Sequence, residues 1–261
     1  MATLQMNILS MKLGMQSNFT VILPSFIPGK DDPNKDYSEL YPRDVRFRTL
    51  WLLPSEYGDD LEGLHYTSIQ RYADETGMAV VMPAPLNRMY SNDPTNQKFI
   101  DYITEELWSV CHGTFALSYD REDNYIGGFS LGAYGALKAA LRNPDKYSKV
   151  FMIGGVFEEG IKDGYFKDIN ARIASQGLTP HLPLDDALPG DEELVLPDSG
   201  KLPDAAVYYA ADDSLADYAK RAVRNLSDAG FSVTSKEFPG RDDWAFRDEA
   251  LKEAVTGFIG K

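Results

Sequence analysis

The 261-residue chain contains one cysteine, Cys111, and only three histidines. A single cysteine cannot form an internal disulfide, and no Cys/His spacing is typical of a zinc site, so the fold has to hold without either support. The sequence also lacks a run of eighteen apolar residues and has no basic, apolar leader at its start. These absences argue against a membrane partner and against secretion. We therefore expect a soluble, cytoplasmic protein in a reducing compartment, with no cofactor and no metal.

Positive charge is scarce as well. The chain has 26 Lys and Arg residues against 40 Asp and Glu residues, which gives a formal net charge of -14. Proteins that bind nucleic acid present clustered Lys and Arg to the phosphates, and no such cluster stands out here. We expect no nucleic-acid partner. With 43% hydrophobic and 25% charged residues, the composition is that of an ordinary globular protein. Its length predicts one large core, in a single domain over residues 1–261.

Segments with the patterns of helices and strands alternate along the chain, after an antiparallel pair at 3–9 and 18–23. Further strands are predicted at 45–53, 78–82, 124–128, 149–154, 205–210 and 231–238, and helices at 62–76, 97–112, 131–142, 215–229 and 243–259. This alternation predicts the α/β class, with a mostly parallel eight-stranded sheet flanked by helices. Residues 157–203 interrupt it with several prolines and an acidic run. We predict a small cap insertion there.

The stretch Gly128-Phe129-Ser130-Leu131-Gly132 lies where a predicted strand meets a predicted helix. In a G-x-S-x-G nucleophile elbow, the two glycines make room for a sharp turn that exposes the serine oxygen above the sheet. The Leu131 N–H, at the start of the helix, is then placed to stabilise an oxyanion. An isolated motif of this kind can also be a simple helix cap. The order of strand, turn and helix favours the nucleophile.

A triad acid and a triad base should follow the nucleophile along the chain. Asp212 and Asp213 come directly after the predicted strand 205–210, and Asp213 is the candidate acid. The same residues can also cap the next helix, and the two roles are compatible. No histidine follows, because the region after the last predicted strand is Gly240-Arg241-Asp242-Asp243-Trp244.

These motifs make the chain resemble the esterase D and tributyrin-esterase branch of the α/β-hydrolase fold, which includes S-formylglutathione hydrolases. The similarity runs nearly from end to end. It is carried by LGM at 13–15, VILP at 21–24, VVMP at 80–83, YS at 90–91, EEL at 105–107, GFSLGAYGA at 128–136, ADD at 211–213 and PGRDDW at 239–244. The resemblance implies a serine esterase for small acyl esters, with Ser130 as the nucleophile and Asp213 as the acid. It also implies self-association into a homo-oligomer.

The resemblance also exposes two departures from the family pattern. Asp242 stands where the family carries its catalytic histidine, and Pro54-Ser55 stand where relatives usually have His-Gly. A carboxylate with a reference pKa of about 3.9 is a much poorer proton acceptor than an imidazole near about 6.5, so Ser130 should stay largely unactivated. A serine in place of glycine restricts the oxyanion loop, and Glu56 adds negative charge beside it. The second oxyanion N–H is expected near Glu56.

Asp213 and Asp242 would form a pair of like charges. Such a pair raises at least one pKa or recruits a cation, for which Arg241 is a candidate. Together with Glu56 the two aspartates could hold a metal, although no calcium-loop spacing supports this.

Three histidines remain as possible substitutes for the missing base. His112 lies in the last turn of a predicted helix, where the helix dipole explains it. His65 lies in a polar stretch and is expected at the surface. His181 falls in the predicted cap and is the candidate surrogate base. Among the aromatic residues, Tyr57 and Tyr90 are expected to line the pocket together with Ser55, since all three are in loops that follow strands.

Two functions are compatible with these features. The first is a serine esterase for small acyl esters whose activity is weak or lost because the triad histidine is absent. The second is a non-catalytic α/β-hydrolase homologue that binds a small ligand or a partner. The intact elbow favours the esterase, and the two departures from the family pattern favour the non-catalytic homologue. The fold does not decide between them, because a fold by itself does not determine function.

Overall fold

The computed structural model describes residues 1–27, 29–84, 90–92, 97–155, 175 and 201–260. The predicted cap at 157–203 falls almost entirely outside these ranges. It therefore stays a prediction, and so does the division of the chain into one domain with an insertion.

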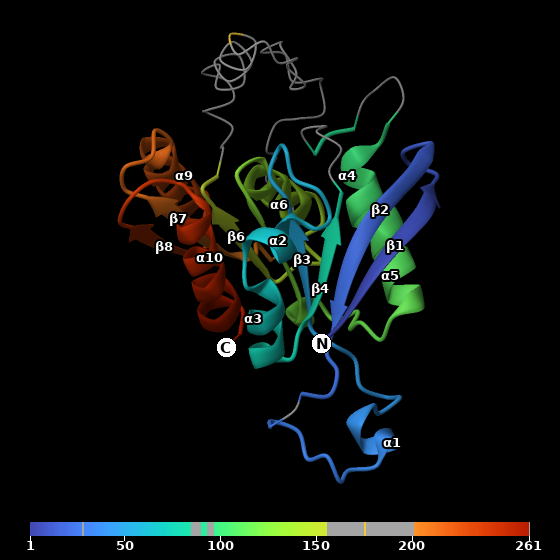
Figure 1. Cartoon of the computed structure of the whole chain (residues 1–261). Helices are drawn as coiled ribbons and strands as arrows, with labels where there is room; N and C mark the ends of the chain where they lie inside the picture. The colour runs from blue at the N-terminus through green and yellow to red at the C-terminus, as the bar shows by residue number, and fades with distance from the viewer. Residues whose placement is uncertain (28, 85–89, 93–96, 156–174, 176–200, 261) are drawn as a thin grey trace.

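The described residues form one eight-stranded sheet in the order β1-β2-β4-β3-β5-β6-β7-β8 (Figure 1). β1 pairs antiparallel with β2, β2 pairs antiparallel with β4, and all the other pairs are parallel. The strands are β1 (Ala2–Ser10), β2 (Met15–Leu23), β3 (Thr49–Leu53), β4 (Ala79–Pro83), β5 (Asn124–Phe129), β6 (Lys149–Ile153), β7 (Asp204–Ala210) and β8 (Val233–Phe238). The predicted mostly parallel sheet with an antiparallel edge is confirmed.

The helices follow the predicted order but are more divided. They are α1 (Tyr37–Leu40), α2 (Glu62–Tyr66), α3 (Ile69–Thr76), α4 (Phe99–Asp101), α5 (Trp108–Thr114), α6 (Leu131–Arg142), α9 (Ala216–Asp228) and α10 (Trp244–Lys252), with a 3₁₀ turn η2 (Arg121–Asp123) and π-helical turns η1 (Tyr102–Leu107) and η3 (Glu253–Phe258). The helix predicted over 62–76 is interrupted before α3, where the Ser68 N–H donates to Asp248 instead of continuing the helical ladder. The strand predicted over 45–53 begins only at Thr49, preceded by an isolated bridge at Phe47.

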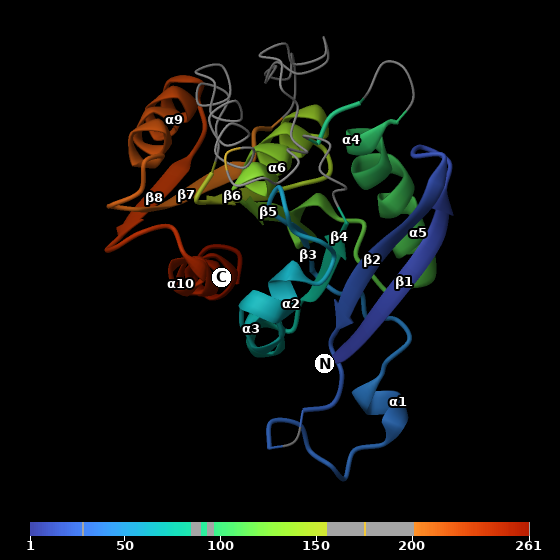
Figure 2. The ribbon, with the colours of Figure 1, turned by 45° about the horizontal axis from the view of Figure 1, so that its top comes forward.

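Helices cover both faces of the sheet (Figure 2). One apolar core joins the sheet to η1, α5, α6 and α9, and a second core on the opposite face joins it to α3, α10 and η3. Because side chains alternate along a strand, neighbouring residues serve different cores: Trp51 packs in the first and Leu52 in the second. No helix in the described ranges is both long enough and apolar enough to span a bilayer.

Candidate active site

Ser130 occupies a strained turn between β5 and α6. Its backbone angles are φ 49° and ψ -114°, and its N–H donates to the Ile153 carbonyl oxygen at 3.0 Å. A positive φ is unfavourable for a residue with a Cβ and costs about 1–3 kcal/mol at such sites. The strained backbone is the one that the G-x-S-x-G motif predicts. It brings the serine to the carboxyl-terminal edge of the parallel strands, where open α/β sheets bind their ligands.

The glycines on either side of Ser130 let neighbouring backbone segments approach each other closely at this turn. A Cβ on Gly128 would lie 2.4 Å from the Gly132 backbone, and a Cβ on Gly132 would lie 2.3 Å from the Leu53 carbonyl oxygen. No real Cβ fits at these distances. Glycine at both positions therefore lets the start of α6 pack directly on the end of β3, which places the oxyanion loop beside the elbow.

The predicted oxyanion site faces a carboxylate. The Leu131 N–H points to Oε2 of Glu56 at 3.5 Å, and Glu56 is only 8% exposed. The Ser55 N–H, in the same loop, donates to Oε2 of Glu62 at 2.8 Å, and its hydroxyl donates to Oε1 of the same carboxylate. The Leu131 N–H and the Ser55 N–H are thus both directed at glutamate side chains, whereas the Glu56 N–H stays the predicted second donor. A substrate oxygen that gains negative charge would meet these carboxylates there.

Glu62, at the start of α2, is a part of this site that the sequence did not reveal. Burial raises the pKa of this carboxyl group, and the hydrogen bonds from Ser55 counteract that shift. Gly58 leaves the space for it, because a Cβ there would lie 2.4 Å from Glu62 Oε1. The sequence held no specific signal, since an acidic residue in the first turn of a helix is usually explained by the helix dipole.

Asp242 is held by an arginine. Its Oδ1 accepts from Nε of Arg247 at 2.6 Å, and its Oδ2 accepts from Nη2 at 3.1 Å. The two side chains are 11% and 16% exposed. The guanidinium also lies over the Trp244 ring, 5.0 Å from the centroid. Burial lowers the pKa of Arg247, but the hydrogen bonds to Asp242 and the negative charges of Asp242, Glu56 and Glu62 together outweigh this effect, and the pKa is raised.

The arginine partner differs from the one expected. Arg241 was the candidate, but it is exposed and Arg247 takes the role. Side chains on a helix tilt toward its N-terminus, so an arginine in the first turns of α10 points back to the loop that precedes the helix. Sequence proximity favoured Arg241, whereas the direction of the helix favours Arg247.

Asp213 and Asp242 follow neighbouring strands of the sheet and lie close enough for their charges to interact. The Asp212 N–H donates to the Gly240 carbonyl oxygen at 2.8 Å, which ties the loop after β7 to the loop after β8. Burial raises the pKa of Asp213, and the Asp242 carboxylate raises it further. Asp242 also packs on the end of β6, since a Cβ on Gly154 would lie 2.4 Å from its Oδ2. The structure therefore brings the predicted acid and base positions together.

Two of the three histidines lie in the described ranges, and neither contacts Ser130. His112 is buried: its Nδ1 is 2.8 Å from the Trp108 carbonyl oxygen and its Nε2 is 3.1 Å from that of Ser118. Burial lowers its pKa. His65 is exposed on α2. His181 lies outside the described residues, so its proposed role as a surrogate base stays a prediction.

The two tyrosines expected around the pocket have different surroundings. Tyr57 is 53% exposed, in the loop after β3. Tyr90 is 1% exposed, and its hydroxyl donates to the Pro54 carbonyl oxygen at 2.6 Å. Its ring packs on α6, where a Cβ on Gly135 would lie 2.3 Å from the ring. Tyr90 therefore supports the oxyanion loop from within the protein and offers almost no surface to a ligand.

A metal site formed by Glu56, Asp213 and Asp242 finds no support. In the part of the chain that the structure describes, no three His, Cys, Asp or Glu side chains are grouped so that they could hold an ion. Arg247 supplies the positive charge among these carboxylates instead.

A serine on a strained strand-to-helix turn, at the carboxyl edge of a mostly parallel sheet with helices on both faces, defines the α/β-hydrolase class. The family model "Putative esterase" matches residues 66–258, and the chain belongs to this esterase family.

Individual relatives agree with this assignment. An acetyl esterase from Caldicellulosiruptor saccharolyticus is 23% identical over 97% of each chain. The structure of FphF, a fluorophosphonate-binding serine hydrolase from Staphylococcus aureus, covers 100% of this chain and 98% of its own at 30% identity, with a TM-score of 0.77. The S-formylglutathione hydrolase FrmB from the same organism covers 100% and 99% at 29% identity, with a TM-score of 0.76.

Proposed function

We propose that this member of the esterase family hydrolyses small acyl esters weakly or not at all, because Asp242 replaces the triad histidine and no histidine in the described part of the chain contacts Ser130. The observation that carries the proposal is the bidentate ion pair between Asp242 and Arg247. Both oxygens of this carboxylate accept hydrogen bonds from the guanidinium. Asp242 is therefore committed to Arg247 and is not oriented toward the serine hydroxyl as a triad histidine would be.

The oxyanion site supports the same proposal independently. Acyl transfer by a serine requires N–H donors that point at the oxygen on which negative charge develops. Here the Leu131 N–H, one of the two predicted donors, faces the Glu56 carboxylate. Without a triad member, such sites keep about 10³–10⁴-fold acceleration over water, and the loss of an oxyanion donor costs about 10²–10³-fold. The two losses together leave little catalysis.

The second candidate is a non-catalytic homologue that binds a small ligand above the elbow. The position of Glu56 favours it, since a buried carboxylate at the oxyanion site opposes an ester transition state but not a ligand that donates hydrogen bonds. The two candidates differ in whether Ser130 reacts.

Hydrolysis of p-nitrophenyl acetate and butyrate measures this directly. We expect the purified chain to exceed its Ser130→Ala variant by no more than about tenfold in kcat/KM, because a serine without an activating base adds little to the residual catalysis that both proteins share. Circular dichroism on both proteins controls for folding. A turnover hundreds of times above the variant would contradict the proposal, because it would require an activating base.

Labelling by a fluorophosphonate probe tests the serine without a choice of substrate. We expect Ser130 to react about 10²–10⁴-fold more slowly than the serine of an active esterase in parallel, since general-base assistance contributes about that factor. Intact mass spectrometry follows the time course, with Ser130→Ala as the blank. Rapid, stoichiometric labelling that is lost in Ser130→Ala would show an activated nucleophile.

A further inference from the structure

Each polar group of Ser55 in the oxyanion loop is hydrogen-bonded. Its N–H donates to Oε2 of Glu62 at 2.8 Å, its hydroxyl donates to Oε1 of the same carboxylate, and its carbonyl oxygen accepts from the Gly58 N–H at 3.1 Å. Ser55 is 7% exposed and Glu62 is 4% exposed, so these bonds lie away from solvent. A buried polar group that loses its partner is strongly disfavoured. Ser55 can therefore leave this conformation only if several bonds break together.

Tyr90 holds the same segment from the opposite side. Its hydroxyl donates to the Pro54 carbonyl oxygen at 2.6 Å. In a trans peptide the C=O and the N–H point in opposite directions, so a Pro54 carbonyl directed at Tyr90 turns the Ser55 N–H the other way. Glu62 accepts this N–H there. The Pro54–Ser55 peptide is thus fixed at its oxygen and at its nitrogen.

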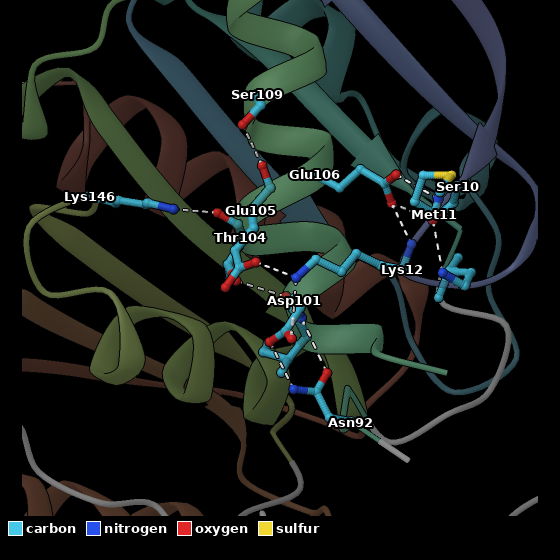
Figure 3. Close-up of polar contacts among 12 residues, drawn as sticks. Ser10, Met11, Lys12, Asn92, Asp101, Thr104, Glu105, Glu106, Ser109 and Lys146 are labelled. Atoms are coloured by element: carbon cyan, nitrogen blue, oxygen red, sulfur yellow. Dashed lines mark hydrogen bonds and ion pairs between the residues drawn. The ribbon is translucent and has the colours of Figure 1, made fainter. Parts of the chain in front are cut away.

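Tyr90 is itself held in an unfavourable backbone conformation. Its φ is 50°, and a positive φ of a residue with a Cβ persists only where the surroundings enforce it. The next two residues are anchored. The Ser91 hydroxyl accepts from Nζ of the buried Lys138 at 2.9 Å. Asn92 exchanges hydrogen bonds with Asp101, at 2.8 Å and 3.4 Å (Figure 3). A strained residue with this many anchors indicates a function for the contact that it makes.

The direction of the Glu56 N–H, the predicted second oxyanion donor, follows from the conformation of Ser55. The two residues share one peptide bond, whose carbonyl oxygen faces the Gly58 N–H. Because this peptide is trans, the Glu56 N–H points away from the turn that Gly58 closes. A rotation of Ser55 would turn this N–H as well. An oxyanion donor contributes only when it points at the oxygen that gains charge.

We propose that Glu62 and Tyr90 are positioning residues, which lock the oxyanion loop and thereby keep the Glu56 N–H aimed at the oxyanion site. The inference rests on the proposed function in taking that N–H as the second donor. Glu62 and Tyr90 are 4% and 1% exposed, so they act on a ligand through the loop and not by contact. Their role is to preorganise a donor that belongs to the backbone.

The rate constant for fluorophosphonate labelling of Ser130 tests this role, because the phosphoryl oxygen of the probe uses the same donors as an oxyanion. Glu62→Ala should lower the rate constant at least about tenfold, since one donor is worth about 10²–10³-fold. Glu62→Gln should restore it to within about threefold, because the amide oxygen accepts the Ser55 N–H and the amide nitrogen donates to the hydroxyl. Glu75→Ala, the same substitution at an exposed position of α3, should have no effect.

Tyr90→Phe keeps the ring and removes the hydroxyl, so it should slow labelling as well. Combined with Glu62→Ala it should add little, since both residues act on one peptide. Hydrogen exchange of the amides at 55–58 should become faster in each variant. Circular dichroism establishes which variants are folded, and if Glu62→Ala is not, Tyr90→Phe decides by the same criterion.

An unchanged or faster rate in a folded Glu62→Ala or Tyr90→Phe variant would overturn the proposal. Equal slowing by Glu62→Gln and Glu62→Ala would overturn it too, because the charge of Glu62 would then matter and not its hydrogen bonds. The ratio of variant to parent separates this inference from the proposed function. Rapid labelling of the unmodified chain would contradict the proposed function, and the ratio would still show whether the loop is locked.

Discussion

The combined substitution Glu56→Gly, Asp242→His and Arg247→Met is expected to raise kcat/KM for p-nitrophenyl acetate by about 10³-fold or more. An imidazole at position 242, beside the Asp213 carboxylate, supplies a general base that is typically worth about 10²–10⁴-fold. Removal of Glu56 frees the Leu131 N–H, and one oxyanion donor is worth about 10²–10³-fold. Arg247 is replaced because its guanidinium would otherwise stay beside the imidazole and lower the pKa of that base.

The partial variants separate the two causes. Asp242→His alone and Glu56→Gly alone should each increase activity less than the combination, since a base and an oxyanion donor act in the same transition state. The combined variant with Ser130→Ala is the blank. If Asp242→His alone gives the full increase, Glu56 does not obstruct the oxyanion site. If the combination gives none and remains folded, the missing base does not limit Ser130.

Arg247→Met is expected to lower the free energy of unfolding by about 3 kcal/mol, the largest stability effect at this site. The substitution leaves the Asp242 carboxylate, which is 11% exposed, without its cation and close to Asp213. Removal of one partner from a buried pair costs about 3–5 kcal/mol, and the remaining exposure places this pair at the low end. Urea denaturation followed by circular dichroism measures the change.

The control is the double variant Arg247→Met with Asp242→Asn, which removes both charges. It should recover most of the lost stability, since replacement of both members of a buried pair is often neutral. Glu249→Gln, an exposed carboxylate on α10, should have little effect. Equal destabilisation by Arg247→Met and by the double variant would mean that Arg247 stabilises through its packing on Trp244 and not through its charge.

The architecture was predictable because it depends on patterns that repeat locally. The alternation of strand and helix segments along the sequence was enough to predict the mostly parallel sheet. The helix α6 begins and ends at the predicted residues. The errors lie at boundaries that long-range contacts decide. The predicted helix over 62–76 breaks before Ile69 because Asp248, from the other end of the chain, accepts the Ser68 N–H. No local propensity contains that information.

The sequence by itself determined two properties of the candidate site: the strained serine between Gly128 and Gly132, and the absence of a histidine after β8. Both are properties of short segments. Steric limits on the backbone define the strained serine, and the identity of one residue defines the missing histidine. Only the tertiary structure decided how the charges are paired. Glu56 meets the Leu131 N–H across 75 positions of the chain, and Arg247 rather than Arg241 holds Asp242. Such partners are selected by which strand ends are adjacent and by the direction in which a helix points its side chains, and the packed sheet fixes both.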